Sequence, residues 1–105
     1  MSLEHRWSKR KQVCLDAIVF HRPFGLLRAE ILDIGLEGVF IRGEHLKLPC
    51  PAIVELTFAL DGDSKRSISH MEAIVIHHSR QGYGLMFKDF RFEAFQVLKD
   101  MLYAA

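Results

Sequence analysis

The chain has 105 residues, of which 50% are hydrophobic, and its formal net charge is +1. That length gives one domain with a small hydrophobic core. The near-neutral charge excludes a protein that recognises nucleic acid through an overall basic surface, so any electrostatic recognition must be local.

Positive charge gathers at the N-terminus, directly ahead of the first apolar run. The segment holds four cations and a histidine that adds a fifth charge when protonated: His5, Arg6, Lys9, Arg10 and Lys11. Because residues 1–11 are polar, we expect a flexible basic leader. Residues 12–105 then form the folded domain.

Six apolar or alternating segments predict β-strands. They cover residues 12–20, 26–34, 39–43, 52–60, 68–78 and 83–87. Turn-forming residues separate them, such as Pro23 and Gly25 in HRPFG and the polar run DGDSKRS. No long helix lies between the strands, which argues against parallel crossover units. The pattern therefore predicts a small all-β domain, either a closed barrel or a sandwich.

The C-terminal segment has a different period. In residues 89–105, five apolar side chains recur at helical spacing: Phe92, Phe95, Leu98, Met101 and Leu102. Lys99 and Asp100 fall on the other side, and Asp89 is a suitable N-cap. We expect an amphipathic helix of about 13 residues, which is too short to be stable alone and therefore packs on the barrel. The alternative is a helix offered to a protein partner.

The first site-like feature is the pair Arg6-x-x-x-Arg10. A guanidinium group presents a planar fork of donors that binds phosphate oxygens bidentately, or the O6 and N7 atoms of guanine. Two arginines four residues apart on an extended segment can hold a ligand from two sides. Taken alone, the pair is also typical of a solvated basic leader.

The second feature is DIGLEG, which places Asp33, Gly35 and Gly38 between two predicted strands. Glycine permits positive φ and a close approach of a ligand to the backbone. An aspartate at the end of a strand can accept hydrogen bonds from a ring N–H and an exocyclic amine. Taken alone, the segment is also compatible with an ordinary hairpin turn.

In this order and spacing, the two features resemble those of the PilZ domain. The resemblance extends from Arg6 to the terminal helix and includes GYGLMF at 82–87, which is similar to the G-x-G-[apolar]-x-F strand of that family. It implies a small six-stranded antiparallel β-barrel followed by a C-terminal α-helix. It also implies a bacterial signalling protein, since many PilZ domains are receptors for cyclic di-GMP.

The resemblance also assigns roles to individual residues. Arg6 and Arg10 match the arginines that grip phosphates and guanine, Asp33 matches the residue that meets a guanine edge, and Gly38 matches the closing glycine. Gly35 stands where the family has serine. One neutral hydrogen bond contributes roughly 0.5–1.5 kcal/mol, which corresponds to about a tenfold change in affinity or less. We therefore expect weakened binding rather than none.

The implied mechanism is coupled ordering. Cyclic di-GMP lies near Asp33 and Gly38, and the leader folds over it so that Arg6 and Arg10 close from the other side. Charge-assisted hydrogen bonds offset the free-energy cost of ordering the segment. Three more residues of the leader are possible secondary contacts: His5, Trp7 and Lys9. We expect no cofactor, and we expect a protein partner downstream.

Four alternatives compete with this interpretation. Gly35 favours a divergent PilZ domain that acts as a protein adaptor without nucleotide. His70, Glu72 and His78 share strand parity, but their spacing matches no metal motif. Binding of single-stranded nucleic acid would need a basic and aromatic strand face, which the sequence lacks. No nucleophile–base spacing or phosphate-binding loop indicates an enzyme.

The remaining features favour a cytoplasmic protein. Cys14 and Cys50 lie far apart without metal-ligand spacing, so we expect two reduced thiols. No apolar run reaches the roughly 18 residues that a membrane span needs. No apolar segment follows MSLE, so we expect no signal peptide.

Overall fold

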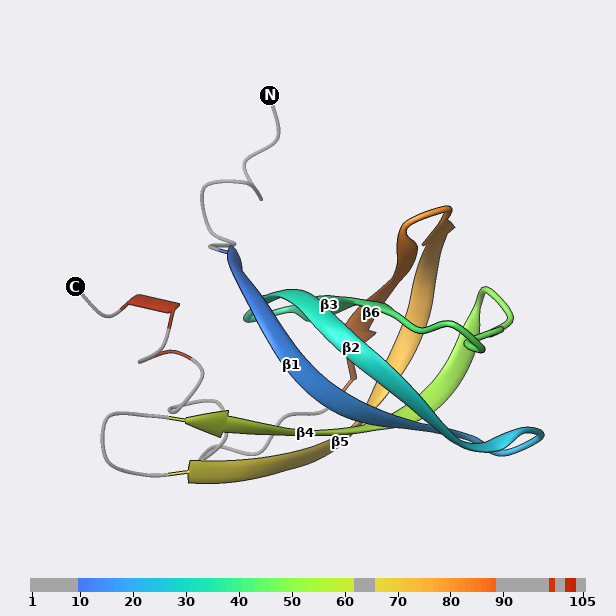
Figure 1. Cartoon of the computed structure of the whole chain (residues 1–105), viewed down its shortest axis with the longest axis horizontal. Coiled ribbons are helices and arrows are strands. Elements are labelled where there is room, and N and C mark those ends of the chain that lie inside the picture. Colours follow the sequence, from blue (N-terminus) through green and yellow to red (C-terminus); the bar gives the residue numbers. More distant parts are fainter. Residues whose placement is uncertain (1–9, 62–65, 89–98, 100–101, 104–105) are drawn as a thin grey trace.

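The computed structural model describes residues 10–61, 66–88, 99 and 102–103 (Figure 1). Its strands are β1 (Arg10–His21), β2 (Gly25–Gly35), β3 (Gly38–Arg42), β4 (Ala52–Asp61), β5 (Arg66–Ser79) and β6 (Gly82–Phe87). The six predicted strands are confirmed. Their boundaries differ from the predicted ones by no more than two residues, and β1 already begins at Arg10. Arg10 and Lys11 therefore belong to the barrel and not to the leader.

The strands form a closed antiparallel barrel in the order β1-β2-β3-β6-β5-β4. Pairing of β1 with β4, from Ala17 opposite Phe58 to Phe20 opposite Glu55, closes the sheet. Every pairing is antiparallel, and each of the hairpins β1–β2, β2–β3, β4–β5 and β5–β6 joins neighbours. The sequence was compatible with either a barrel or a sandwich. The β1–β4 pairing closes the sheet, so the domain is a barrel.

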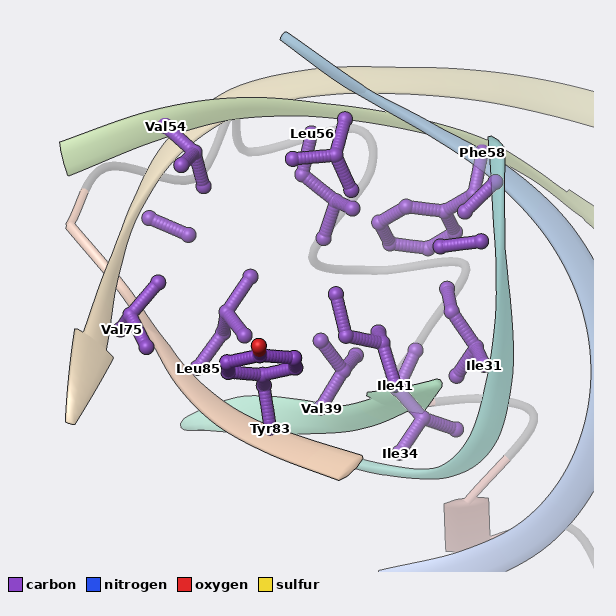
Figure 2. Close-up of a cluster of buried hydrophobic side chains, with 14 of the residues drawn as sticks. Ile31, Ile34, Val39, Ile41, Val54, Leu56, Phe58, Val75, Tyr83 and Leu85 are labelled. Carbon is purple, nitrogen blue, oxygen red and sulfur yellow. The ribbon is translucent and has the colours of Figure 1, made fainter. Parts of the chain in front are cut away.

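Alternation of the strand residues fills the interior with apolar side chains from all six strands (Figure 2). Fully buried examples are Val19, Ile31, Ile41, Leu56, Leu60 and Val75. Each such side chain contributes roughly 1.5–3 kcal/mol relative to an exposed one. The interior is thus a packed core, and ligands must be recognised on the outside of the barrel or at its ends.

The connection between β3 and β4 covers one end of the core. Leu46 and Leu48 in it are buried. The Tyr83 hydroxyl holds this connection by accepting a hydrogen bond from Leu48 N and donating one to Leu46 O, both at 3.1 Å. A tyrosine suits this position because its ring belongs to the core while its hydroxyl satisfies two buried backbone groups.

The predicted terminal helix lies almost entirely outside the described residues. Of that region the structure describes Lys99, Leu102 and Tyr103, and Leu102 is buried against the barrel core. The packing of Leu102 agrees with the expected docking, while the helix itself stays a prediction. Within the described part, no helix is long and apolar enough to cross a membrane.

Candidate functional site

Asp33 lies at a pair of β-bulges in the middle of the sheet. The β1–β2 register shifts between Gln12 and Leu15, and the β2–β3 register shifts between Ile31 and Asp33. Strict alternation would turn Asp33 to the same face as the fully buried Ile31. Ile34 takes the interior position instead, three residues after Ile31. The bulges therefore direct the Asp33 carboxylate to the outside of the barrel, as bulges near functional sites often do.

The Arg10 guanidinium binds this carboxylate. Arg10 is the first residue of β1 and stands opposite Gly35, while Asp33 stands opposite Gln12. Arg10 Nε donates to Asp33 Oδ1 at 2.7 Å, and a second guanidinium nitrogen donates to the same oxygen. That second nitrogen also lies 3.4 Å from the Gly38 carbonyl oxygen. Arg10, Asp33 and Gly38, which are widely separated in sequence, are thus neighbours on the barrel surface.

The pair keeps hydrogen-bonding capacity on its exposed side. The Arg10 and Asp33 side chains are 43% and 31% exposed. Both guanidinium donors go to Oδ1, so within the described residues Asp33 Oδ2 receives no hydrogen bond. A guanidinium has five N–H groups, of which only part are used here. Donors and an acceptor therefore lie side by side, an arrangement complementary to guanine, which carries acceptors at O6 and N7 and a donor at N2.

Gly38 is glycine for a reason other than the one expected from sequence. It has no positive φ; among the described residues only Gly25 and Gly82 do. A Cβ at position 38 would lie 2.0 Å from the Leu85 carbonyl oxygen on β6. Any side chain here would push β3 away from β6, with which Gly38 pairs opposite Met86. The motif glycine allows the close strand approach that brings its carbonyl to Arg10.

Gly35 is buried at the end of β2, opposite Arg10. It has no positive φ either. The position where the resemblance expects a serine hydroxyl therefore stands opposite Arg10 and carries no side chain.

Four of the predicted site residues come together: Arg10, Asp33, Gly35 and Gly38. The other four, His5, Arg6, Trp7 and Lys9, lie outside the described residues, so their roles stay predictions.

The sequence analysis missed three neighbours of the site. Gln12 and Phe40 flank Asp33 on β1 and β3, and Met86 stands opposite Gly38 on β6. The half-buried Phe40 ring also reaches over β6, since a Cβ on Gly82 would lie 3.1 Å from it. Strand alternation predicts that Phe40 points outward. Its position beside Asp33 depends on the β-bulge, which cannot be recognised in the sequence.

The histidines considered for a metal site have separate partners. His70 contacts Thr57 Oγ1 at 2.6 Å and Glu55 Oε1 at 2.9 Å, as a cross-strand group on the outside of β4 and β5. Glu72 pairs with Lys88, and the His78 ring stacks on Tyr83. No cluster of three or more metal-ligating side chains occurs in the described ranges.

Cys14 donates a hydrogen bond to Glu30 Oε2 at 2.9 Å on the outer face of β1 and β2. This hydrogen bond, together with the negative charge of Glu30, raises the pKa of the Cys14 thiol. The same bond, supported by Arg42 on the other carboxylate oxygen, lowers the pKa of Glu30. Both cysteines are free. The thiolate is the reactive form of cysteine, and a raised pKa lowers the fraction of thiolate. Cys14 is therefore a weaker nucleophile than an ordinary thiol.

The comparisons with known proteins agree with this architecture. No protein-family model matches the sequence, and no curated protein matches it. Among solved structures, the chain is similar to the Bacillus subtilis inhibitor of motility, MotI/DgrA, with a TM-score of 0.74 and 16% identity over 88% of this chain. It is also similar to the PilZ domain of CeSA from a cellulose-synthesizing bacterium, with a TM-score of 0.62 and 14% identity.

The extent of these likenesses defines what they show. The alignment with the CeSA domain covers 90% of this chain and 94% of that domain, whereas the chain spans 47% of the inhibitor of motility. Identities of this size show the fold. The chain therefore has the fold of a PilZ domain, and the resemblance found in the sequence is confirmed at that level.

We predict that Gly38→Ala weakens the fold. The new methyl group collides with the Leu85 carbonyl and strains the β3–β6 pairing, which lowers the free energy of unfolding by roughly 1–3 kcal/mol. Urea denaturation followed by circular dichroism measures the change. Gly84→Ala is the matched control on the β6 side of the same strand pair. Its Cβ would meet only the His77 side chain, at 3.3 Å, so this variant should cost less. Equal stability of Gly38→Ala and the unmodified chain would contradict the steric argument.

We predict that Cys14 reacts slowly with iodoacetamide at pH 8. Its raised pKa leaves a smaller thiolate fraction than an ordinary thiol has at that pH. Glu30→Gln removes the negative charge, lowers the pKa of Cys14 and speeds its alkylation. Mass spectrometry follows both cysteines in one reaction, and the rate of the distant Cys50 serves as the internal control. An unchanged Cys14 rate would show that Glu30 does not hold the thiol.

Proposed function

We propose that the chain binds cyclic di-GMP on the outer surface at Arg10, Asp33, Gly35 and Gly38, and passes the signal to a protein partner. The observation that carries the proposal is the Arg10–Asp33 pair beside the Gly38 carbonyl. It joins both sequence motifs at one place, in a fold shared with a PilZ domain. The proposed role is binding and signalling, without catalysis.

Arg10 acts in this proposal as a preset contact. Its backbone is fixed in β1, so only side-chain freedom remains to be lost when it meets a phosphate. Arg6, four residues earlier, is the group that closes over the ligand. The clamp thus has one fixed arginine and one that is ordered on binding.

The Arg10–Asp33 pair does not block the ligand. An ion pair between partly exposed groups contributes only about 0–1 kcal/mol. Hydrogen bonds to charged groups contribute roughly 1.5–3 kcal/mol each, so a bidentate contact with phosphate or guanine can reorient the guanidinium. Asp33 then offers its carboxylate to the guanine N–H groups.

A second candidate is a PilZ-fold adaptor that binds its partner without nucleotide. Gly35 favours it, because the serine hydroxyl expected at that position is absent next to Arg10. Pull-down from a bacterial extract, with and without cyclic di-GMP, separates the two. Capture that depends on the dinucleotide supports the receptor, and capture independent of it supports the adaptor.

We predict that cyclic di-GMP gives a measurable binding isotherm with the full chain in titration calorimetry, and that Arg10→Ala weakens it at least tenfold. The variant loses charge-assisted hydrogen bonds of about 1.5–3 kcal/mol each. Arg22→Ala, an exposed arginine in the β1–β2 turn at the far end of the hairpin, is the control and should bind as the unmodified chain does. Absence of heat at high micromolar ligand would overturn the proposed function.

Gly35→Ser restores the hydroxyl next to Arg10. We predict that it tightens binding by up to about tenfold, the value of one neutral hydrogen bond. Gly35→Ala adds bulk without a hydroxyl and serves as the control. If serine and alanine change the affinity equally, the hydroxyl has no part in recognition.

A further inference from the structure

One edge of β2 has no strand beside it at the end remote from Asp33. β1 pairs with β2 from Gly25 to Gly35, whereas β3 pairs only over Glu30–Ile34. In the part of the chain that the structure describes, no strand pairs with the other edge of residues 25–29. Gly43 approaches the Arg28 carbonyl, so the open stretch runs over Gly25–Leu27, with Phe24 and Arg28 at its ends. An unpaired edge of this kind is a template for another strand.

A groove runs along this edge. It has a volume of about 1180 Å³ and lies between β2, the β3–β4 connection and the tip of the β5–β6 hairpin. Its lining includes Leu26, Arg28, His45, Leu46, Arg80 and Tyr83. In Figure 1 the β1–β2 and β5–β6 hairpins end far apart on the same side of the barrel. The groove therefore gives access to the backbone of β2 from the side.

The edge also carries large apolar side chains on the surface. Leu26 is 72% exposed and Phe24 is 59% exposed. Arg28, two residues after Leu26 on the same face of the strand, is exposed and makes no ion pair within the described residues. The groove as a whole is balanced in charge, with Arg28, Arg42 and Arg80 against Asp16, Glu30 and Glu44. The groove thus favours an occupant that has apolar and aromatic side chains and little net charge.

We infer that this occupant is the same edge of a second copy of the chain. Antiparallel pairing about a twofold axis at Leu26 uses the open stretch and the two residues at its ends. It sets Leu26 against Leu26, and Phe24 of each copy against Arg28 of the other. The first contact covers the most exposed leucine of the edge, and the second places a guanidinium by an aromatic ring, a favourable cation–π arrangement.

Other symmetric registers fit less well. An axis at Leu27 sets Leu26 against Arg28, and it sets Phe24 against Glu30, whose edge β3 already occupies. The axis at Leu26 also places Gly25 opposite Leu27, where the missing side chain gives the leucine room. The result is a self-complementary interface in which one patch serves both copies. It leaves the Arg10–Asp33 surface, at the other end of β2, uncovered.

Crosslinking tests the register directly. In a Cys14→Ser, Cys50→Ser background, Leu26→Cys should form a disulfide-linked dimer under mild oxidation, since directly opposite residues have Cα atoms about 4.5–5.5 Å apart and a disulfide tolerates about 4.4–6.8 Å. Arg28→Cys alone should stay monomeric on a non-reducing gel. A mixture of Phe24→Cys and Arg28→Cys chains should give the crosslinked dimer. Equal crosslinking of Leu26→Cys and Arg28→Cys would overturn the register.

Sedimentation equilibrium tests the interface without cysteines. The unmodified chain should have twice the monomer mass at high micromolar concentration, and Leu26→Lys should return it to the monomer, because two ammonium groups then face each other. Ile68→Lys is the matched control: Ile68 is also 72% exposed but lies on β5, outside the groove. A monomeric unmodified chain, or a dimer insensitive to Leu26→Lys, would overturn the inference. These measurements need no nucleotide, so their outcome is independent of the proposed binding site.

Discussion

The outward turn of Asp33 is the constraint on which the site depends. Between Ile31 and Asp33, β2 has one residue more than β3, and between Gln12 and Leu15, β1 has one residue more than β2. An aspartate that alternation assigns to the core therefore emerges on the surface. A carboxylate in the interior would have no water and no partner, a cost of several kcal/mol. On the surface it meets Arg10 instead, so the bulges that keep the carboxylate out of the core also create the Arg10–Asp33 pair.

Close packing of β3 against β6 supports this arrangement. Because Gly38 has no side chain, its strand lies against the Leu85 carbonyl and its own carbonyl lies near Arg10. Gly35 adds a second position without a side chain, opposite Arg10. Gly38 therefore acts through strand packing, and Gly35 leaves the position opposite Arg10 without a side chain.

β2 links two surfaces with different chemistry. At its C-terminal end, bulges and glycines place an ion pair with spare donors and acceptors on the barrel. At its N-terminal end, β3 no longer accompanies it, and the strand leaves an apolar edge open to the groove. The packed core between them is rigid. The two surfaces share a strand and no side chain, so a change on one of them leaves the side chains of the other in place.

The sequence by itself determined the strands, the core and the identity of the motif residues. Alternation marks Leu27, Ala29 and Ile31 as interior without any knowledge of neighbours, and the spacing of Arg10, Asp33 and Gly38 indicates a PilZ-like site. Only the tertiary structure decided that the sheet closes, that Arg10 belongs to β1, that Asp33 turns outward and that Gly38 is needed for strand packing. The reason is physical: periodicity is local, whereas bulges, register and close approach depend on which strand lies alongside.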